Sequence, residues 1–87
     1  MADFAVVLAR SARRELEALL PPILGRVIAG LDTLARDPRP RGARKLRGPE
    51  NFWSMRVGDY RIVYGIDDRA HVVDVVRIRH RRDVYDV

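Results

Sequence analysis

The sequence predicts a two-layer α+β domain in the order β-α-α-β-β-β, with a helical hairpin packed on one face of a mainly antiparallel four-stranded sheet. Three observations support this fold class. Apolar residues recur at helical spacing between residues 11 and 37, and they alternate with polar residues from residue 52 onward. Short turns containing Gly and Asp divide that second region into strands. The 87 residues suffice for a single domain, residues 1–87, with one modest core.

The N-terminal half supplies one strand and two helices. Residues 4–9 are a short β-rich run that predicts the first strand. Ser11 follows in the position of a helix N-cap, where its hydroxyl could accept a hydrogen bond from a free amide of the first turn. Pro21-Pro22 ends that helix and begins the next one, whose apolar stripe covers residues 23–35. Gly30 inside this second helix costs about 1 kcal/mol relative to alanine.

The C-terminal half is expected to form a sheet after a Pro-, Gly- and Arg-rich loop at residues 38–51. A periodicity of two predicts three strands, Phe52–Val57, Tyr60–Ile66 and His71–Ile78. The turns between them are Gly58-Asp59 and residues 67–70. Residues 81–86 are expected to add a final helical turn.

The predicted hairpin brings two arginines face to face. If Gly58-Asp59 is a two-residue turn, Val57 pairs with Tyr60 and Arg56 lies directly opposite Arg61. Like charges in such a pair are destabilising by roughly 0.2–1 kcal/mol, and an anion bound between them would remove the repulsion. The alternative is that both side chains extend into solvent, where salt screens the pair.

Alternation along the strands assigns residues to two faces of the sheet. The two arginines share their face with Ser54 and Val63. The opposite face should pack on the helices, and it carries Met55, Val57, Tyr60, Ile62, Tyr64, Ile66, Val73 and Val75.

The net charge is +5, and almost all of the positive charges are arginines, because Lys45 is the only lysine among seventeen cations. The cations cluster at residues 36–47 and 77–82, which indicates a polyanionic partner, either nucleic acid or an acidic protein. Arginine suits phosphate because its planar fork binds two oxygens and keeps its proton. The candidate RNA-binding residues in these clusters are Arg44, Lys45, Arg47, Arg77, Arg79 and Arg82.

Several function classes are excluded by composition. The absence of cysteine excludes disulfides, zinc knuckles and thiol catalysis. The longest apolar run, residues 4–9, is far shorter than the about 20 residues that cross a bilayer, and no cationic segment precedes it. We therefore expect a cytoplasmic domain that does not contact the membrane.

Two residues of the C-terminal segment could take part in proton transfer. His80 has a side chain whose ordinary pKa lies near neutrality, so it could move a proton. Tyr85 could stack on a base or carry a proton. The alternative for both is a packing or surface role, which is the commoner one near a chain terminus.

The hairpin and the C-terminal segment together resemble the pattern of RelE-type toxins. The matching stretches are Gly58-Asp59-Tyr60-Arg61-Ile62-Val63-Tyr64, Asp67-Asp68 and His80-Arg81-Arg82-Asp83-Val84-Tyr85. Lys45-Leu46-Arg47-Gly48 is similar to the segment that usually precedes the first sheet hairpin of these toxins. The chain is identified on these motifs as a member of the RelE/ParE toxin superfamily, with a RelE-like fold along nearly its whole length.

The resemblance implies a toxin of a type II toxin–antitoxin system. RelE-like members cleave messenger RNA, many of them on the ribosome, whereas members of the ParE branch share the fold and poison DNA gyrase. The implied partners are a cognate antitoxin, mRNA and the ribosome or, in the alternative, DNA gyrase. Operator DNA would be contacted only through the antitoxin complex. An acidic, partly disordered antitoxin that folds on binding could cover the basic surface.

The resemblance also implies roles for individual residues. Arg61 matches the arginine that contacts the scissile phosphate, Arg81 the second arginine and Tyr85 the terminal tyrosine. His80 matches a histidine that several members use in proton transfer, and Arg56 would add a further cation. Neither a cofactor nor a metal is expected, because RNA can be cut by its own 2′-hydroxyl if the protein supplies a base, an acid and cations.

One departure from the family pattern bears on activity. The best-known RelE toxin carries two lysines on the strand before the hairpin, and those positions fall at Phe52 and Ser54 here. Neither side chain is a cation or a base. Either His80 and Arg56 take over these roles, or the protein is a weak nuclease or none. The gyrase-directed function and a degenerate toxin that only binds its antitoxin therefore stay open.

Overall fold

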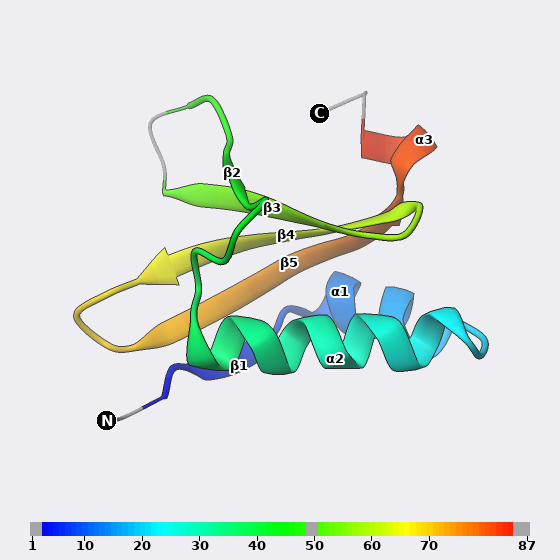
Figure 1. Cartoon of the computed structure of the whole chain (residues 1–87), viewed down its shortest axis with the longest axis horizontal. Coiled ribbons are helices and arrows are strands. Elements are labelled where there is room, and N and C mark those ends of the chain that lie inside the picture. The colour runs from blue at the N-terminus through cyan, green and yellow to red at the C-terminus, as the bar shows by residue number, and fades with distance from the viewer. Residues whose placement is uncertain (1–2, 49–50, 85–87) are drawn as a thin grey trace.

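The structure, a computed structural model, describes residues 3–48 and 51–84. Its five-stranded mixed sheet has the order β1-β5-β4-β3-β2, and Figure 1 shows α1 and α2 on the same side of it. The elements are β1 (Ala5–Leu8), α1 (Arg10–Glu17), α2 (Ile23–Arg36), β2 (Arg44–Lys45), β3 (Phe52–Val57), β4 (Tyr60–Asp67), β5 (Val72–His80) and α3 (Arg81–Val84). The predicted two-layer α+β class is confirmed. None of the helices described is long and apolar enough to cross a membrane.

The sheet has five strands where four were predicted. The extra strand is β2, two residues of the predicted loop that pair with Ser54 and Trp53 of β3. A two-residue strand has no periodicity, so the sequence carries no local signal for it. Strand β1 pairs in parallel with β5, and all other pairs are antiparallel.

Helix α1 protects the edge of the sheet where β1 stops. The last residue pair between β1 and β5 is Leu8 with Val75, so the outer edge of β5 lacks a strand partner beyond that point. The prediction that Ser11 caps α1 is wrong, because the helix starts at Arg10 without a side-chain cap. The Ser11 hydroxyl instead donates to the carbonyl of Val76 at 2.9 Å, which satisfies a polar group of the exposed edge.

A β-bulge in β5 changes which side chains face the helices. Val63 pairs with Arg77 but Tyr64 pairs with Val75, so Val76 is an extra residue in its strand. Strict alternation from Val75 would turn Arg77 toward the core. With the extra residue, Ile78 takes the core position instead and is buried at 2% exposure. Arg77 and Arg79 on either side of it then face away from α2.

The core lies between the sheet and the two helices α1 and α2, with Ala12 of α1 fully buried. The predicted apolar face is confirmed, since Met55, Ile62, Tyr64, Ile66, Val73 and Val75 are buried and Val57 and Tyr60 pack against them. Gly30 allows α2 to approach closely, because a Cβ there would lie 3.1–3.3 Å from Met55, Val57 and Ile62. Glycine at position 30 therefore lowers the helix propensity of α2, but it allows the helix to pack tightly on the sheet.

Candidate nucleic-acid interface

A row of three arginines crosses the face of the sheet that points away from α2. Arg56 of β3 pairs with Arg61 of β4, as predicted, and Arg61 pairs in turn with Arg79 of β5. Directly opposed like charges are destabilising, so this row is not explained by the stability of the sheet. Arg44 and Arg77 lie at the two ends of the neighbouring row, which passes through Ser54 and Val63. Within the described strands, the open face therefore carries five arginines.

The carboxylate of Glu15 neutralises only one end of the row. Its Oε2 atom accepts a hydrogen bond from Arg79 Nε at 2.9 Å and lies 3.9 Å from Arg77 Nη1. Among the side chains that the structure describes, neither Arg56 nor Arg61 forms an ion pair. These two guanidinium groups are thus the part of the row that can receive an external anion.

A short hydrogen bond holds the guanidinium group of Arg56, whereas that of Arg61 has only a long one. Arg56 Nε donates to the carbonyl of Gly58 at 2.8 Å, and Arg61 Nη1 donates weakly to Ser54 Oγ at 3.4 Å. Ser54 is almost fully buried at 2% exposure, so it is a fixed acceptor. Phe52 stands at the other position where the family pattern has a lysine. Its ring packs over Gly65, and Phe52 Cε1 lies 3.2 Å from where a Cβ of Gly65 would be.

The C-terminal segment approaches the site from the turn between β3 and β4. Figure 1 shows α3 beside that turn, and the Arg81 amide donates to the carbonyl of Asp59 at 2.7 Å. Arg81 and Arg82 are both exposed there. Tyr85 lies outside the described residues.

His80 occupies the face opposite the arginine row. It pairs with Tyr60, and the two rings meet edge to face with centroids 5.3 Å apart. Its Nδ1 atom accepts a hydrogen bond from the Arg82 amide at 3.3 Å. With Nδ1 engaged by the Arg82 amide, Nε2 is the ring nitrogen left free for a ligand.

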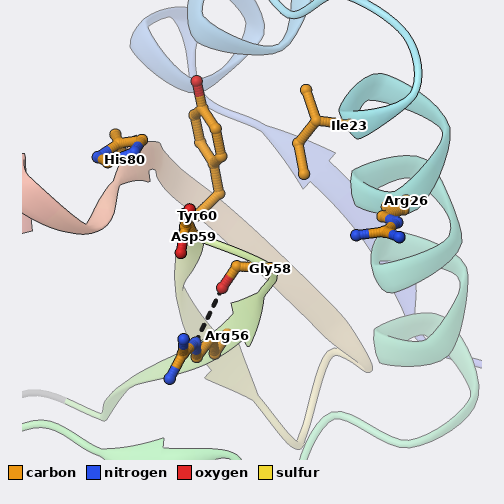
Figure 2. Close-up of a pocket in the computed structure, with 7 residues that line it drawn as sticks. All are labelled: Ile23, Arg26, Arg56, Gly58, Asp59, Tyr60 and His80. Carbon is orange, nitrogen blue, oxygen red and sulfur yellow. Dashed lines mark hydrogen bonds between the residues drawn. The ribbon is translucent and has the colours of Figure 1, made fainter.

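An open cavity of about 620 Å³ joins this face to the end of the arginine row. Figure 2 shows its lining, which comprises Ile23, Arg26, Arg56, Gly58, Asp59, Tyr60 and His80. Arg56 and His80, predicted together from the sequence, do line one cavity. Sequence reasoning missed Arg26, because its approach to the hairpin depends on how α2 packs and no motif marks it.

The basic loop before β3 is anchored at its base. Arg39 forms a bidentate pair with Asp68 at 3.1 and 2.9 Å and lies over the ring of Trp53 at 5.3 Å. The hydrogen bond from Arg39 holds the pKa of the Asp68 carboxyl below its ordinary value. The buried Tyr64 hydroxyl donates to the carbonyl of Pro38 at 2.8 Å, and burial raises the pKa of Tyr64 to about 12.

Four exposed cations follow Arg39 in this part of the described chain, namely Arg41, Arg44, Lys45 and Arg47. Arg44 shares the face of the arginine row. Lys45 pairs with Trp53 and so falls on the alternate face. No group of three His, Asp or Glu side chains that could hold a metal ion occurs among the described residues.

Comparison with known proteins decides the family. The model of a family described as "ParE toxin of type II toxin-antitoxin system, parDE" matches residues 6–85. The chain belongs to this toxin family. The membership in the RelE/ParE superfamily that we inferred from the hairpin and the C-terminal motif is confirmed.

Relatives of this toxin include members named for RelE. It is 36% identical to Toxin RelG of Mycobacterium tuberculosis over 83 residues. This alignment covers 94% of the present chain and 95% of RelG. It is 31% identical to Toxin RelE of the same organism over 83 residues, or 94% of this chain and 86% of that one.

Solved structures share the architecture of this toxin. The toxin–antitoxin complex RelBE2 from M. tuberculosis matches with a TM-score of 0.80 and 36% identity, covering 95% of this chain and 97% of that one. The archaeal RelE–RelB complex from Pyrococcus horikoshii OT3 matches with a TM-score of 0.82, covering 93% and 98%. At 23% identity, the latter similarity concerns the fold alone.

Proposed function

We propose that this toxin is a metal-independent endoribonuclease that cleaves mRNA on the ribosome. The observation that carries the proposal is the row Arg56–Arg61–Arg79, of which only Arg79 has a carboxylate partner among the described side chains. Two unneutralised guanidinium groups on adjacent strands match the oxygens of one phosphate group, because each presents several N–H donors in a plane.

The proposed reaction uses the substrate's own nucleophile. The 2′-oxygen bonds to the adjacent phosphorus, the bond from phosphorus to the 5′-oxygen breaks, and a 2′,3′-cyclic phosphate remains. Arg61 and Arg56 stabilise the charge that builds on the phosphate oxygens, and Arg81 adds a third cation from the end of the hairpin. The proton on the 2′-hydroxyl must leave, and the 5′-oxygen must receive one.

His80 is proposed to supply the proton of the leaving 5′-oxygen from Nε2 of its imidazolium form. Because His80 lies on the helix side of the sheet, this role places the leaving group at the end of the hairpin, where Arg56 and His80 line the same cavity. Tyr85 is proposed as the second group that handles a proton or stacks on a base. Phe52 and Ser54 supply neither a cation nor a base at their positions.

The remaining cations are proposed to bind the RNA backbone on either side of the cut. They are Arg44, Lys45, Arg47, Arg77, Arg79 and Arg82. A cognate antitoxin is proposed as the partner that covers this surface, since the RelBE2 relative was solved as a toxin–antitoxin complex. Operator DNA would then be bound through that complex.

Inhibition of DNA gyrase is the second candidate function. It is favoured by the match to the ParE family model and by Phe52 and Ser54, which leave the open face without a lysine or a general base there. In this case the arginine row would bind an acidic surface of a protein.

A brief induction of the toxin in cells separates the two functions. New 5′ ends inside translated codons, mapped by primer extension, are the result expected for the nuclease. Plasmid supercoiling is assayed on the same cells. Intact transcripts together with trapped gyrase–DNA complexes would overturn the nuclease proposal in favour of the gyrase inhibitor.

A further inference from the structure

We infer that the cavity beside the Gly58-Asp59 turn is a subsite for one unpaired nucleotide of RNA, with its phosphate between Arg26 and Arg56 and its base against Tyr60 and His80. The inference rests on the proposed action on RNA, and it adds a residue of α2 to the interface. It concerns the face of the hairpin opposite the arginine row, where the cavity opens at the end of the sheet.

The two arginines flank the turn from different elements. Arg56 Nε is held by the carbonyl of Gly58 at 2.8 Å, which leaves its two terminal amino groups for a ligand. Arg26 Nη1 lies 3.8 Å from where a Cβ of Gly58 would be. Figure 2 shows Arg26 and Arg56 on opposite sides of Gly58, and both side chains are exposed. Neither of them forms an ion pair with a described side chain.

Gly58 keeps the space between these arginines open. Its φ of +59° is a conformation that other residues rarely adopt, and a Cβ there would also lie 3.5 Å from Ile23 Cδ1. The backbone can therefore pass close to the guanidinium groups without covering them. A phosphate between two guanidinium groups gains charge-assisted hydrogen bonds from both.

The aromatic side of the cavity suits a base. The rings of Tyr60 and His80 are half-buried and meet edge to face, and Ile23 adds an apolar surface. Unpaired bases stack on such side chains, whereas a base inside a duplex is not accessible to them. Asp59, which also lines the cavity, can accept a hydrogen bond from a base amino group or a 2′-hydroxyl. Arg26 and Arg56 carry two positive charges and Asp59 one negative charge. The net charge of these three side chains is therefore +1, which matches one phosphate better than several.

Arg56 connects the subsite to the proposed cleavage site. Its backbone pairs with Arg61 in the arginine row, and its side chain lines the cavity. A single strand bound across Arg61 can therefore continue around the end of the hairpin, with consecutive phosphates on the open face and between Arg26 and Arg56. Single-stranded RNA is flexible enough for that path, and duplex RNA is not.

The first test measures binding of a six-nucleotide 2′-O-methyl RNA by fluorescence anisotropy over a range of salt concentrations. This RNA cannot be cleaved, because it lacks the free 2′-hydroxyl. We expect Arg26→Gln to weaken binding about fivefold or more and to reduce the slope of log Kd against log salt by about 0.7, the loss of one phosphate contact. Arg36→Gln is the matched control in the same helix, about 15 Å further along, and should change Kd less than about twofold.

The second test addresses the aromatic wall. Tyr60→Phe keeps a ring and should retain the wild-type Kd, whereas Tyr60→Leu should weaken binding about fivefold or more. The ring protons of Tyr60 and His80 should shift in NMR spectra of wild-type toxin on addition of the same RNA.

The outcomes distinguish the subsite from the proposed nuclease activity. If Arg26→Gln binds like Arg36→Gln and the two rings do not shift, the subsite is wrong, even where the wild-type toxin still cleaves unmodified RNA. If the subsite variants behave as expected but unmodified RNA stays intact, the nuclease proposal fails and the nucleotide subsite stands. If the wild-type toxin binds no RNA, both are wrong.

Discussion

The carboxylate of Glu15 and the guanidinium group of Arg79 are joined by a 2.9 Å hydrogen bond between residues 64 positions apart in the sequence. The other oxygen of the same carboxylate accepts the Ile78 amide at 2.8 Å. One side chain of α1 therefore satisfies a backbone donor on the free edge of β5 and neutralises the last arginine of the row. The edge of the sheet and the charge of the open face thus depend on the same residue.

Replacing Glu15 by alanine is expected to destabilise the toxin. Glu15→Ala leaves the Ile78 amide without its acceptor and Arg79 without a partner, and we expect a loss of about 1–3 kcal/mol in the free energy of unfolding. Urea denaturation measures the change. Glu17→Ala, an exposed position of the same helix, should stay within about 0.5 kcal/mol of wild type. Equal losses in the two variants would contradict the role of the Glu15 contacts.

Replacing Glu15 by glutamine separates charge from structure. The amide oxygen of Glu15→Gln can still accept the Ile78 amide, but Arg79 and Arg77 lose their counter-charge. We expect this variant to bind single-stranded RNA more tightly, with a slope of log Kd against log salt that is steeper by about 0.7 for each arginine released. An unchanged salt slope would show that Arg79 does not reach the RNA backbone.

Removal of the central arginine is expected to abolish toxicity without unfolding the protein. Arg61 is half-buried on the open face and bonds only weakly to Ser54, so Arg61→Ala should keep a wild-type circular dichroism spectrum and urea midpoint. Arg81→Ala should behave alike, and both should reduce RNA cleavage at least about 100-fold. Arg69→Ala, an exposed cation in the turn after β4, serves as the control and should remain toxic. Full toxicity of both site variants would refute the assignment.

The buried Tyr64 hydroxyl predicts a pH dependence of stability. Tyr64→Phe removes the hydrogen bond to Pro38 and should cost about 1 kcal/mol or more at pH 7. Burial raises the pKa of Tyr64 from 10.0 to about 12, so the folded state keeps a proton that the unfolded state loses. The stability that the neutral phenol contributes is therefore complete below pH 10 and falls between pH 10 and about 12. Urea denaturation across this range should show the gap between wild type and Tyr64→Phe becoming smaller. A constant gap would contradict the shifted pKa.

Two glycines of α2 should respond in opposite ways to alanine. A Cβ at Gly25 meets nothing within 4 Å, so Gly25→Ala should raise the free energy of unfolding by about 0.5–1 kcal/mol through helix propensity. A Cβ at Gly30 would meet Met55, Val57 and Ile62 at 3.1–3.3 Å, so Gly30→Ala should lose about 1 kcal/mol or more. Thermal unfolding of both variants tests this difference. Stabilisation by Gly30→Ala would show that the three neighbours can move apart at little cost.

The central pairing of the site could be predicted from local sequence. Gly58-Asp59 sets the length of the turn, and alternation then places Arg56 opposite Arg61 and the apolar residues on the helix side. These features need only neighbours along one hairpin, and a slip of one residue would expose the whole apolar face. The arginine clusters at residues 36–47 and 77–82 likewise indicate an anionic partner from sequence alone.

The rest of the site depends on contacts between distant segments. The bulge at Val76 brings Arg79 into line with Arg61, and Glu15 from α1 then neutralises it. His80 lies on the helix side, across the sheet from the row with which the sequence had grouped it. Residue patterns carry no signal for a bulge or for the approach of a helix, because both are selected by the packing of the complete sheet. Turn length and alternation therefore sufficed for the arginine pair, whereas its extension, its counter-charge and the cavity beside it were decided by tertiary packing.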